Sequence, residues 1–166
     1  VAGPYYMDQI DDIKKTIAEQ QLDIVPVEGQ ELDEEQQTAL DDAIAQITDE
    51  DIYNYILEMN PDVKGIFATN GDTTMQALTA CEGKDMKYVV IMGYDADQEE
   101  IDAMKDGRIA GMIVQNPYGM GYATVVAEAR CVLNMGNEAN VNTGYTWVTP
   151  DNIEDRTVQD ILYAEK

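Results

Sequence analysis

The chain has 166 residues, of which 45% are hydrophobic, and its 33 acidic and 10 basic side chains give a net charge of −23 at pH 7. That length suits one ordinary domain with a sizeable core, while the negative charge argues against nucleic acid, anionic membrane surfaces and large acidic substrates as partners. The absence of histidine removes the commonest general base and metal ligand, and Cys81 and Cys131 show neither a CxxC pair nor the spacing of a zinc site.

The first third of the chain predicts two strands and three helices. In chain order these are a strand tail at 1–3, a helix over 7–20, a short strand over 22–27, a helix over 33–48 and a helix from 49 to 59. Ile10, Ile13 and Ile17 lie on one stripe of the first helix, and Thr48 with Asp51 resembles a capping box. Because the chain opens within a strand pattern, we expect it to be part of a longer protein.

The middle of the chain alternates strands and helices regularly. The predicted elements are a strand over 63–68, a helix over 72–81, a strand over 88–93, a helix over 98–105, a strand over 109–114 and a long helix from 117 to about 135. Near-continuous apolar strands are typical of a parallel sheet that is buried on both faces. We therefore predict an α/β fold with a doubly wound, mostly parallel five-stranded sheet, flavodoxin-like strand order 2-1-3-4-5 and helices on both faces.

The end of the chain follows a different pattern. Residues 143–149 alternate like an exposed strand, and residues 151–166 predict a loop with a short helix. We interpret this tail as a segment that crosses to something outside this chain.

Three polar side chains mark the carboxyl ends of neighbouring predicted strands: Asn70, Asp95 and Gln115. In an open parallel sheet these ends line the ligand crevice. Amides both donate and accept hydrogen bonds and a carboxylate accepts several, which suits a polyhydroxy ligand. Alternatively, Asn70 is a turn amide that caps the next helix, and Asp95 or Asp97 caps the helix at 98.

Four strings in the same order and spacing carry a resemblance to a known family: PDVKGIFATN, YVVIMGYDAD, IDAMKDGRIAGMIVQNPYGMGY and NTGYTWVTPDNI. They resemble the carboxyl-terminal lobe of sugar-binding, type I periplasmic binding proteins of the ribose and galactose type. The resemblance covers nearly the whole chain. It implies a non-enzymatic receptor without metal or cofactor, in which two doubly wound lobes close on a small solute. Residues 1–142 would then be a ligand-binding lobe, and residues 143–166 a hinge-crossing tail that returns to an N-terminal lobe outside this chain.

The resemblance also implies which residues touch the ligand. Asn70, Asp95 and Gln115 match ligand-contacting positions of the family. Three tyrosines could stack on a sugar ring or serve as rim or packing residues: Tyr5, Tyr6 and Tyr118.

The chain departs from the family pattern in three places. Ribose-type members carry an arginine near Met7 or Asp8, which this chain lacks, and this argues against ribose itself. Gly71 stands where the family usually has aspartate. The helix over 33–48 corresponds to an insertion.

These observations predict the sugar-binding lobe of an extracytoplasmic ABC-transporter receptor, whose partners are a small carbohydrate, an N-terminal lobe and a permease. The alternatives are the effector-binding lobe of a lactose-repressor-type regulator or of a membrane sensor, and an enzyme on a flavodoxin-like fold. No GxGxxG, P-loop or nucleophile elbow supports the enzyme. The exposed lobe face could also form a homodimer, which a monomeric mass in sedimentation would contradict.

Overall fold

The computed structural model describes residues 7–25, 27, 31–138 and 140–162. The chain divides into two compact units, one formed by Val1–Lys64 with Thr79–Lys87 and the other by Gly65–Leu78 with Tyr88–Lys166. The predicted strand tail at 1–3 lies outside the described residues.

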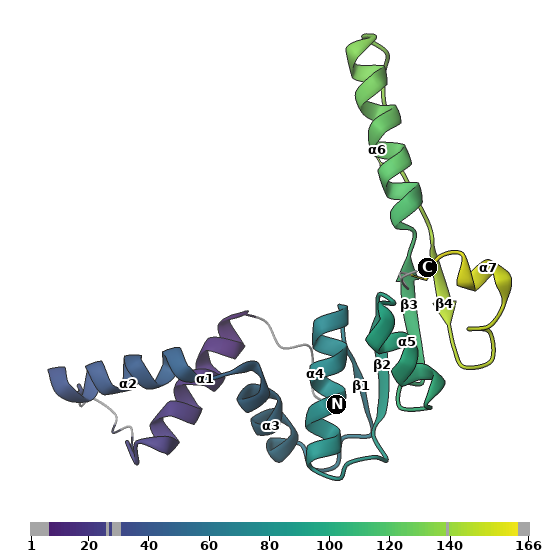
Figure 1. Cartoon of the computed structure of the whole chain (residues 1–166). Helices are drawn as coiled ribbons and strands as arrows, with labels where there is room; N and C mark the ends of the chain where they lie inside the picture. Colours follow the sequence, from purple (N-terminus) through teal and green to yellow (C-terminus); the bar gives the residue numbers. More distant parts are fainter. Residues whose placement is uncertain (1–6, 26, 28–30, 139, 163–166) are drawn as a thin grey trace. The chain divides into compact units, whose positions relative to one another are not determined.

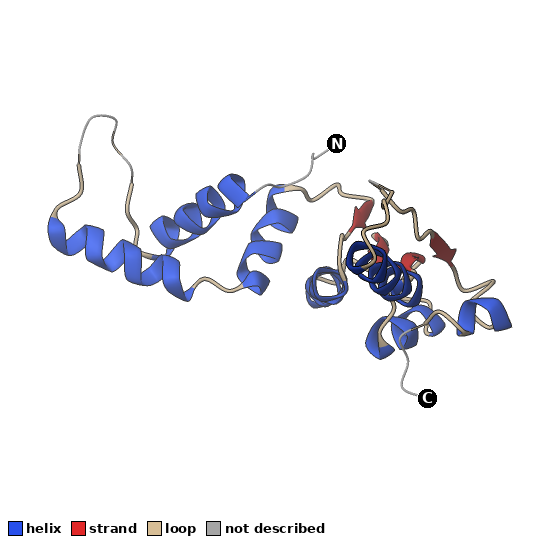
Figure 2. Ribbon diagram, turned by 90° about the horizontal axis from the view of Figure 1, so that it is seen from above, coloured by secondary structure: helices blue, strands red, loops and turns tan. Residues whose placement is uncertain are grey.

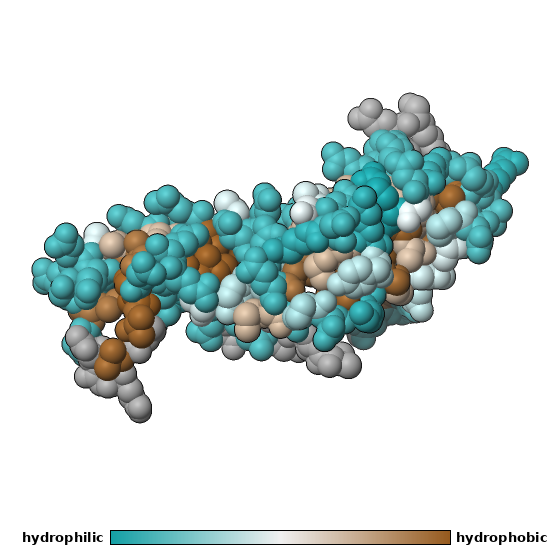
Figure 3. Space-filling model, turned by 90° about the horizontal axis from the view of Figure 1, so that it is seen from below, coloured by the Kyte–Doolittle hydropathy of each residue, from teal (hydrophilic) through white to brown (hydrophobic). Residues whose placement is uncertain are grey.

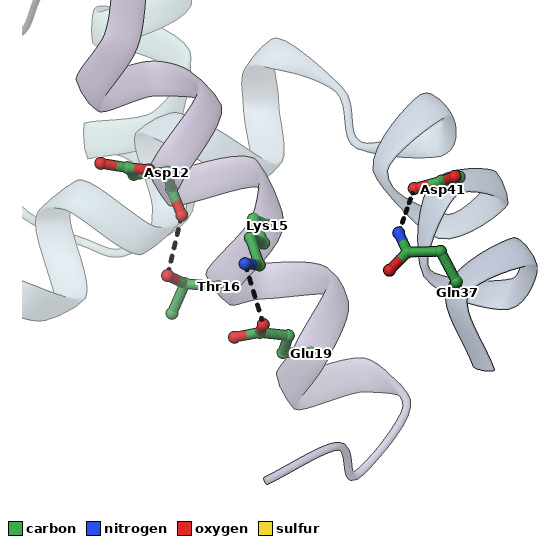
Figure 4. Close-up of polar contacts among 6 residues, drawn as sticks. All are labelled: Asp12, Lys15, Thr16, Glu19, Gln37 and Asp41. Carbon is green, nitrogen blue, oxygen red and sulfur yellow. Dashed lines mark hydrogen bonds and ion pairs between the residues drawn. The ribbon is translucent and has the colours of Figure 1, made fainter. Parts of the chain in front are cut away.

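The first unit contains three helices, α1 (Met7–Gln21), α2 (Glu34–Gln46) and α3 (Asp49–Met59) (Figure 1). A small apolar cluster holds them together through the buried side chains of Ile13, Ile17, Ile47 and Ile52. Two of these residues come from the predicted isoleucine stripe, so the helical pattern of the sequence is confirmed. The solvent-facing sides carry local polar contacts, such as the hydrogen bond from Gln37 to Asp41 (Figure 4).

The strand predicted over 22–27 is wrong for its described residues. The chain instead turns after α1, where Leu22 N–H donates to Ala18 C=O at 3.0 Å and Ile24 N–H donates to Glu19 C=O at 2.9 Å. Asp23 adopts a positive φ of 54°, the left-handed conformation that ends helices. These backbone bonds use groups that a strand would need for its ladder.

The second unit is built on a four-stranded sheet in the order β1-β2-β3-β4 (Figures 1 and 2). Its strands are β1 (Gly65–Phe67), β2 (Val90–Tyr94), β3 (Gly111–Gln115) and β4 (Tyr145–Val148). The first three are parallel neighbours, which confirms the predicted parallel part, and β4 pairs antiparallel with β3. The sheet therefore has four described strands instead of five, and part of the predicted crossing tail lies within it.

One face of this sheet is buried and the other is largely open. Ile91, Met112, Val114 and Val148 point to the buried face and are at most 2% exposed. On the opposite face Phe67 and other side chains are about half exposed, which differs from the predicted burial on both faces. The helix that follows β3, Pro117–Val132, does not cover this face, because none of its described residues is buried.

Four helices accompany the sheet strands: α4 (Gly71–Gly83), α5 (Gln98–Lys105), α6 (Pro117–Val132) and α7 (Arg156–Gln159). Figure 1 shows α6 continuing beyond the carboxyl end of β3, away from the sheet. Within the described part of the chain, no helix is long and apolar enough to cross a membrane. Figure 3 shows that hydrophilic side chains cover most of the face in view, as the acidic composition predicts.

Candidate functional site

The carboxyl ends of β2 and β3 bring two predicted site residues into direct contact. Gln115 is the last residue of β3, and Asp95 directly follows β2. The Gln115 side-chain amide donates a hydrogen bond to Asp95 Oδ1 at 3.0 Å. The parallel register, which pairs Tyr94 with Ile113, brings these two strand ends to the same edge. The amide of Gln115 thus fixes the direction of the Asp95 carboxylate.

The backbone at Asp95 has an unusual conformation. Its φ is 77°, in the left-handed region that aspartate tolerates better than most residues. Its N–H donates to Ile113 C=O at 3.0 Å, which anchors the turn to β3. Asp97, and not Asp95, is the N-cap of α5, because its side chain accepts the N–H of Glu100. The Asp95 carboxylate is therefore not used as a cap of α5.

Asn70 directly precedes α4 and caps this helix, which was one of the two roles that the sequence allowed for it. Its Oδ1 accepts the N–H of Thr73 at 2.9 Å, and its backbone C=O accepts the Thr74 hydroxyl at 2.7 Å. The side-chain nitrogen of Asn70 makes no hydrogen bond to any residue that the structure describes. Helix capping thus occupies the oxygen of this amide and leaves its donor end for a ligand.

A hollow of about 290 Å³ lies at these strand ends, within the second unit. It is lined by Asn70, Gly71, Asp72, Asp95 and Asp97. None of these residues is basic, so the hollow offers carboxylate oxygens to hydroxyl donors and the amide nitrogen of Asn70 to an acceptor. Its chemistry is that of a site for a polyol or another donor-rich ligand.

The predicted tyrosines do not add to this hollow. Tyr118 belongs to the first turn of α6, is 83% exposed and is not among the residues that line the hollow. Tyr5 and Tyr6 lie outside the described residues. Their stacking on a sugar ring stays a prediction.

Glu100 is a residue of this region that sequence reasoning missed. Its side chain is 0% exposed, although it is an acidic residue in the first turn of a short helix. Burial raises the pKa of this carboxyl to about 7, the nearby Asp97 and Asp95 carboxylates raise it further, and the hydrogen bond from the Asp97 N–H opposes the rise. The nearby Thr74 hydroxyl donates its proton to Asn70 C=O. The spacing of Asp97 and Glu100, typical of a capping box, was the only available signal.

Gly71 contacts the same carboxyl. A Cβ built on Gly71 would lie 3.2 Å from Glu100 Oε2 and 3.5 Å from its Cδ. Glycine at this position therefore leaves room for a carboxyl group that reaches it from α5.

A second hollow, of about 390 Å³, runs along α6 and away from the strand ends. Its walls are α6 and the segment that returns toward β4, with Tyr122, Val126, Arg130 and Val141 among the lining residues. It is mainly apolar and contains none of the predicted site residues. Both cysteines are free thiols, Cys81 buried and Cys131 exposed.

Comparison with known proteins gives a consistent family. A profile of the periplasmic binding protein domain matches residues 3–131. The ribose import binding protein of Salmonella typhimurium is 33% identical over 66 residues, which are 40% of this chain and 22% of that protein.

Two solved structures share the fold. A solute-binding protein of an ABC transporter from Agrobacterium vitis with bound D-fucose has a TM-score of 0.63 and 21% identity, over 92% of this chain and 62% of that one. Another from the same organism, with bound α-D-tagatopyranose, has a TM-score of 0.65 and 18% identity, over 94% of this chain and 60% of that one. The chain therefore spans about three fifths of the length of these proteins.

Proposed function

The chain belongs to the periplasmic binding protein family, a family of binding proteins and not of enzymes, and from this premise we propose that it is the sugar-binding carboxyl-terminal lobe of an ABC-transporter receptor. The ligand is a neutral monosaccharide held at the ends of β1, β2 and β3. In the whole protein a first lobe closes over this sugar, and the closed form docks on a permease outside the cytoplasm.

The observation that carries this proposal is the meeting of Asp95 and Gln115 beside Asn70. One carboxylate oriented by an amide, next to a second amide with an unused donor, matches the alternating donors and acceptors of a sugar ring. An enzyme would instead need a nucleophile paired with a base, or a general acid and base at reacting distance. The named relatives bind ribose by name and D-fucose or tagatose in crystals, which favours a monosaccharide as the ligand class.

One lobe supplies half of such a cleft, so we expect millimolar affinity for the chain alone. The test is a titration of the ¹⁵N-labelled chain with D-ribose, D-galactose and D-fucose, followed by NMR. Saturable shifts of the Asn70 and Gln115 side-chain amides and of the Gly71 backbone amide are expected for at least one sugar. Absence of saturable shifts at these groups with every sugar would contradict the proposal.

A matched pair of variants sharpens this test. Gln115→Glu keeps the shape of the side chain but replaces the donor to Asp95 with a second carboxylate, so the shifts should disappear. Gln46→Glu makes the same change on α2, where the Gln46 amide donates only to a nearby backbone carbonyl. The Gln46 variant should bind as the wild type does, and equal loss in both variants would make the effect one of charge alone.

A further inference from the structure

The two carboxyl oxygens of Glu100 differ in their hydrogen bonding: one has a partner and the other has none among the described residues. Oε2 accepts the N–H of Asp97 at 3.2 Å, in the capping box that starts α5. Oε1 is buried and has no hydrogen-bond partner among the described residues. An unpaired buried oxygen costs free energy, and it is tolerated where a site uses it or where it carries a proton.

The same side chain contacts both turns that carry the candidate ligand residues. In the capping box its Oε2 accepts the N–H of Asp97, two residues after Asp95. Its Oε2 also lies 3.2 Å from the position of a Cβ on Gly71, the residue directly after Asn70. The Glu100 carboxyl therefore lies next to both the turn at Asn70 and the turn at Asp95.

The charged groups that act on Glu100 through space are the Asp97 and Asp95 carboxylates, in the turn after β2. Asp72 lines the neighbouring hollow from α4, Glu99 precedes Glu100 on α5, and none of the residues that line the hollow is basic. A second or third negative charge here repels the others in a medium of low dielectric constant. Ionisation of Glu100 thus opposes the packing of its own carboxyl against Gly71.

We propose that Glu100 is a positioning residue of the binding site, whose neutral form holds the Asn70 and Asp95 turns together and whose ionised form loosens them and weakens sugar binding. The effect on sugar binding rests on the proposed function, whereas the effect of Glu100 ionisation on the two turns does not. The pKa of about 7 places the change near neutrality. Affinity should fall about fivefold as pH rises through this value, the low end of coupling between two sites.

The ligand-free test follows the wild type from about pH 5 to about pH 9, a range above the ordinary pKa of Asp and Glu. The ¹³C carboxyl resonance of Glu100 should titrate with a midpoint near 7 instead of 4.5, together with the Gly71 and Asp97 amides. In Glu100→Gln the shared titration of the two amides should vanish, whereas Glu99→Gln should keep it. An ordinary midpoint, or unchanged amide titration in Glu100→Gln, overturns the proposal.

Stability supplies a second readout. Because the folded pKa lies above the ordinary 4.5, the unfolded chain loses this proton first as pH rises. The free energy of unfolding of the wild type should therefore fall between about pH 4.5 and about pH 7, relative to Glu100→Gln, and then run parallel. A constant difference between the two proteins over this range would contradict the buried neutral state.

The sugar titrations separate the two proposals. If a sugar binds, wild-type affinity should fall through neutrality while Glu100→Gln retains its low-pH affinity, and a flat wild-type profile overturns the positioning role. If no sugar binds at any pH but the Glu100 and Gly71 resonances titrate together, the proposed function fails while the structural part of this inference stands.

Discussion

At the scale of single residues, the candidate site lies where polar side chains stabilise the starts of helices, and polar groups that no cap uses remain beside them. Asn70 caps α4 through its side-chain oxygen, so its side-chain nitrogen is not needed for the cap. Asp97 is the N-cap of α5, so the Asp95 carboxylate is not needed for that cap. Asp95 remains in a left-handed conformation at a strand end, a conformation that costs free energy and is common at functional sites. The backbone and the carboxylate of Asp95 therefore need separate tests.

Replacing Asp95 by alanine and by glycine separates these two contributions. Both variants remove the acceptor of the Gln115 amide, so both should lose the sugar-induced shifts. At φ 77° only glycine is free of strain, so Asp95→Ala should be less stable than Asp95→Gly by about 1 kcal/mol in urea unfolding. Equal stabilities would show that the left-handed conformation is not kept in solution.

At the scale of elements, the sequence predicted the features that depend on neighbouring residues, such as helix caps and strand ends. Thr48 and Asp51 form the predicted capping box of α3, and the strand ends at Asp95 and Gln115 meet as a parallel sheet requires. The strand at 22–27 was not predictable, because its apolar residues fit a strand but the turn at Asp23 depends on how α1 ends. The burial of Glu100 depends on the approach of Gly71, a contact between separate elements that no local pattern encodes.

The capping box of α3 allows a matched test of position. Thr48 Oγ1 accepts the N–H of Asp51 at 3.3 Å. The Asp51 carboxylate accepts the Thr48 hydroxyl at 2.6 Å and the Thr48 N–H at 2.9 Å, and these two bonds, the hydroxyl first, lower the Asp51 pKa. Thr48→Ala should cost about 1 kcal/mol in urea unfolding, as for other lost N-caps. Thr16→Ala makes the same change inside α1, where the hydroxyl donates back to Asp12 C=O (Figure 4).

Since alanine is the better helix former, Thr16→Ala should be neutral or slightly stabilising. If the two variants lost equal stability, the hydroxyl at Thr48 would have no special value as a cap.

At the scale of the whole molecule, apolar surface remains uncovered. Helix α6 is apolar around much of its circumference, yet none of its described residues is buried, and one face of the sheet is largely open. A helix of this composition is normally covered on at least one side. The chain spans about 62% of the length of a solved relative, and the sequence alone could not reveal how much surface the rest would cover.

A pair of valine-to-alanine variants tests whether α6 is exposed in solution. Val125 on α6 is 65% exposed and Val114 on β3 is 0% exposed. Val114→Ala should destabilise the chain by about 2 kcal/mol, because it leaves a cavity in the core. Val125→Ala should change the free energy of unfolding by less than about 0.5 kcal/mol, as at other surface positions.

If Val125→Ala lowered the free energy of unfolding as much as Val114→Ala, α6 would be covered in solution. The dependence of this loss on protein concentration would then show what covers the helix. If a second copy of the chain covers α6, the cost will depend on protein concentration and sedimentation will give a dimeric mass, because association stabilises the folded state by mass action. If α6 folds back on its own sheet, the cost will be independent of concentration and the mass monomeric. A small cost at Val125 would show that α6 is an exposed apolar helix in solution, as the structure has it.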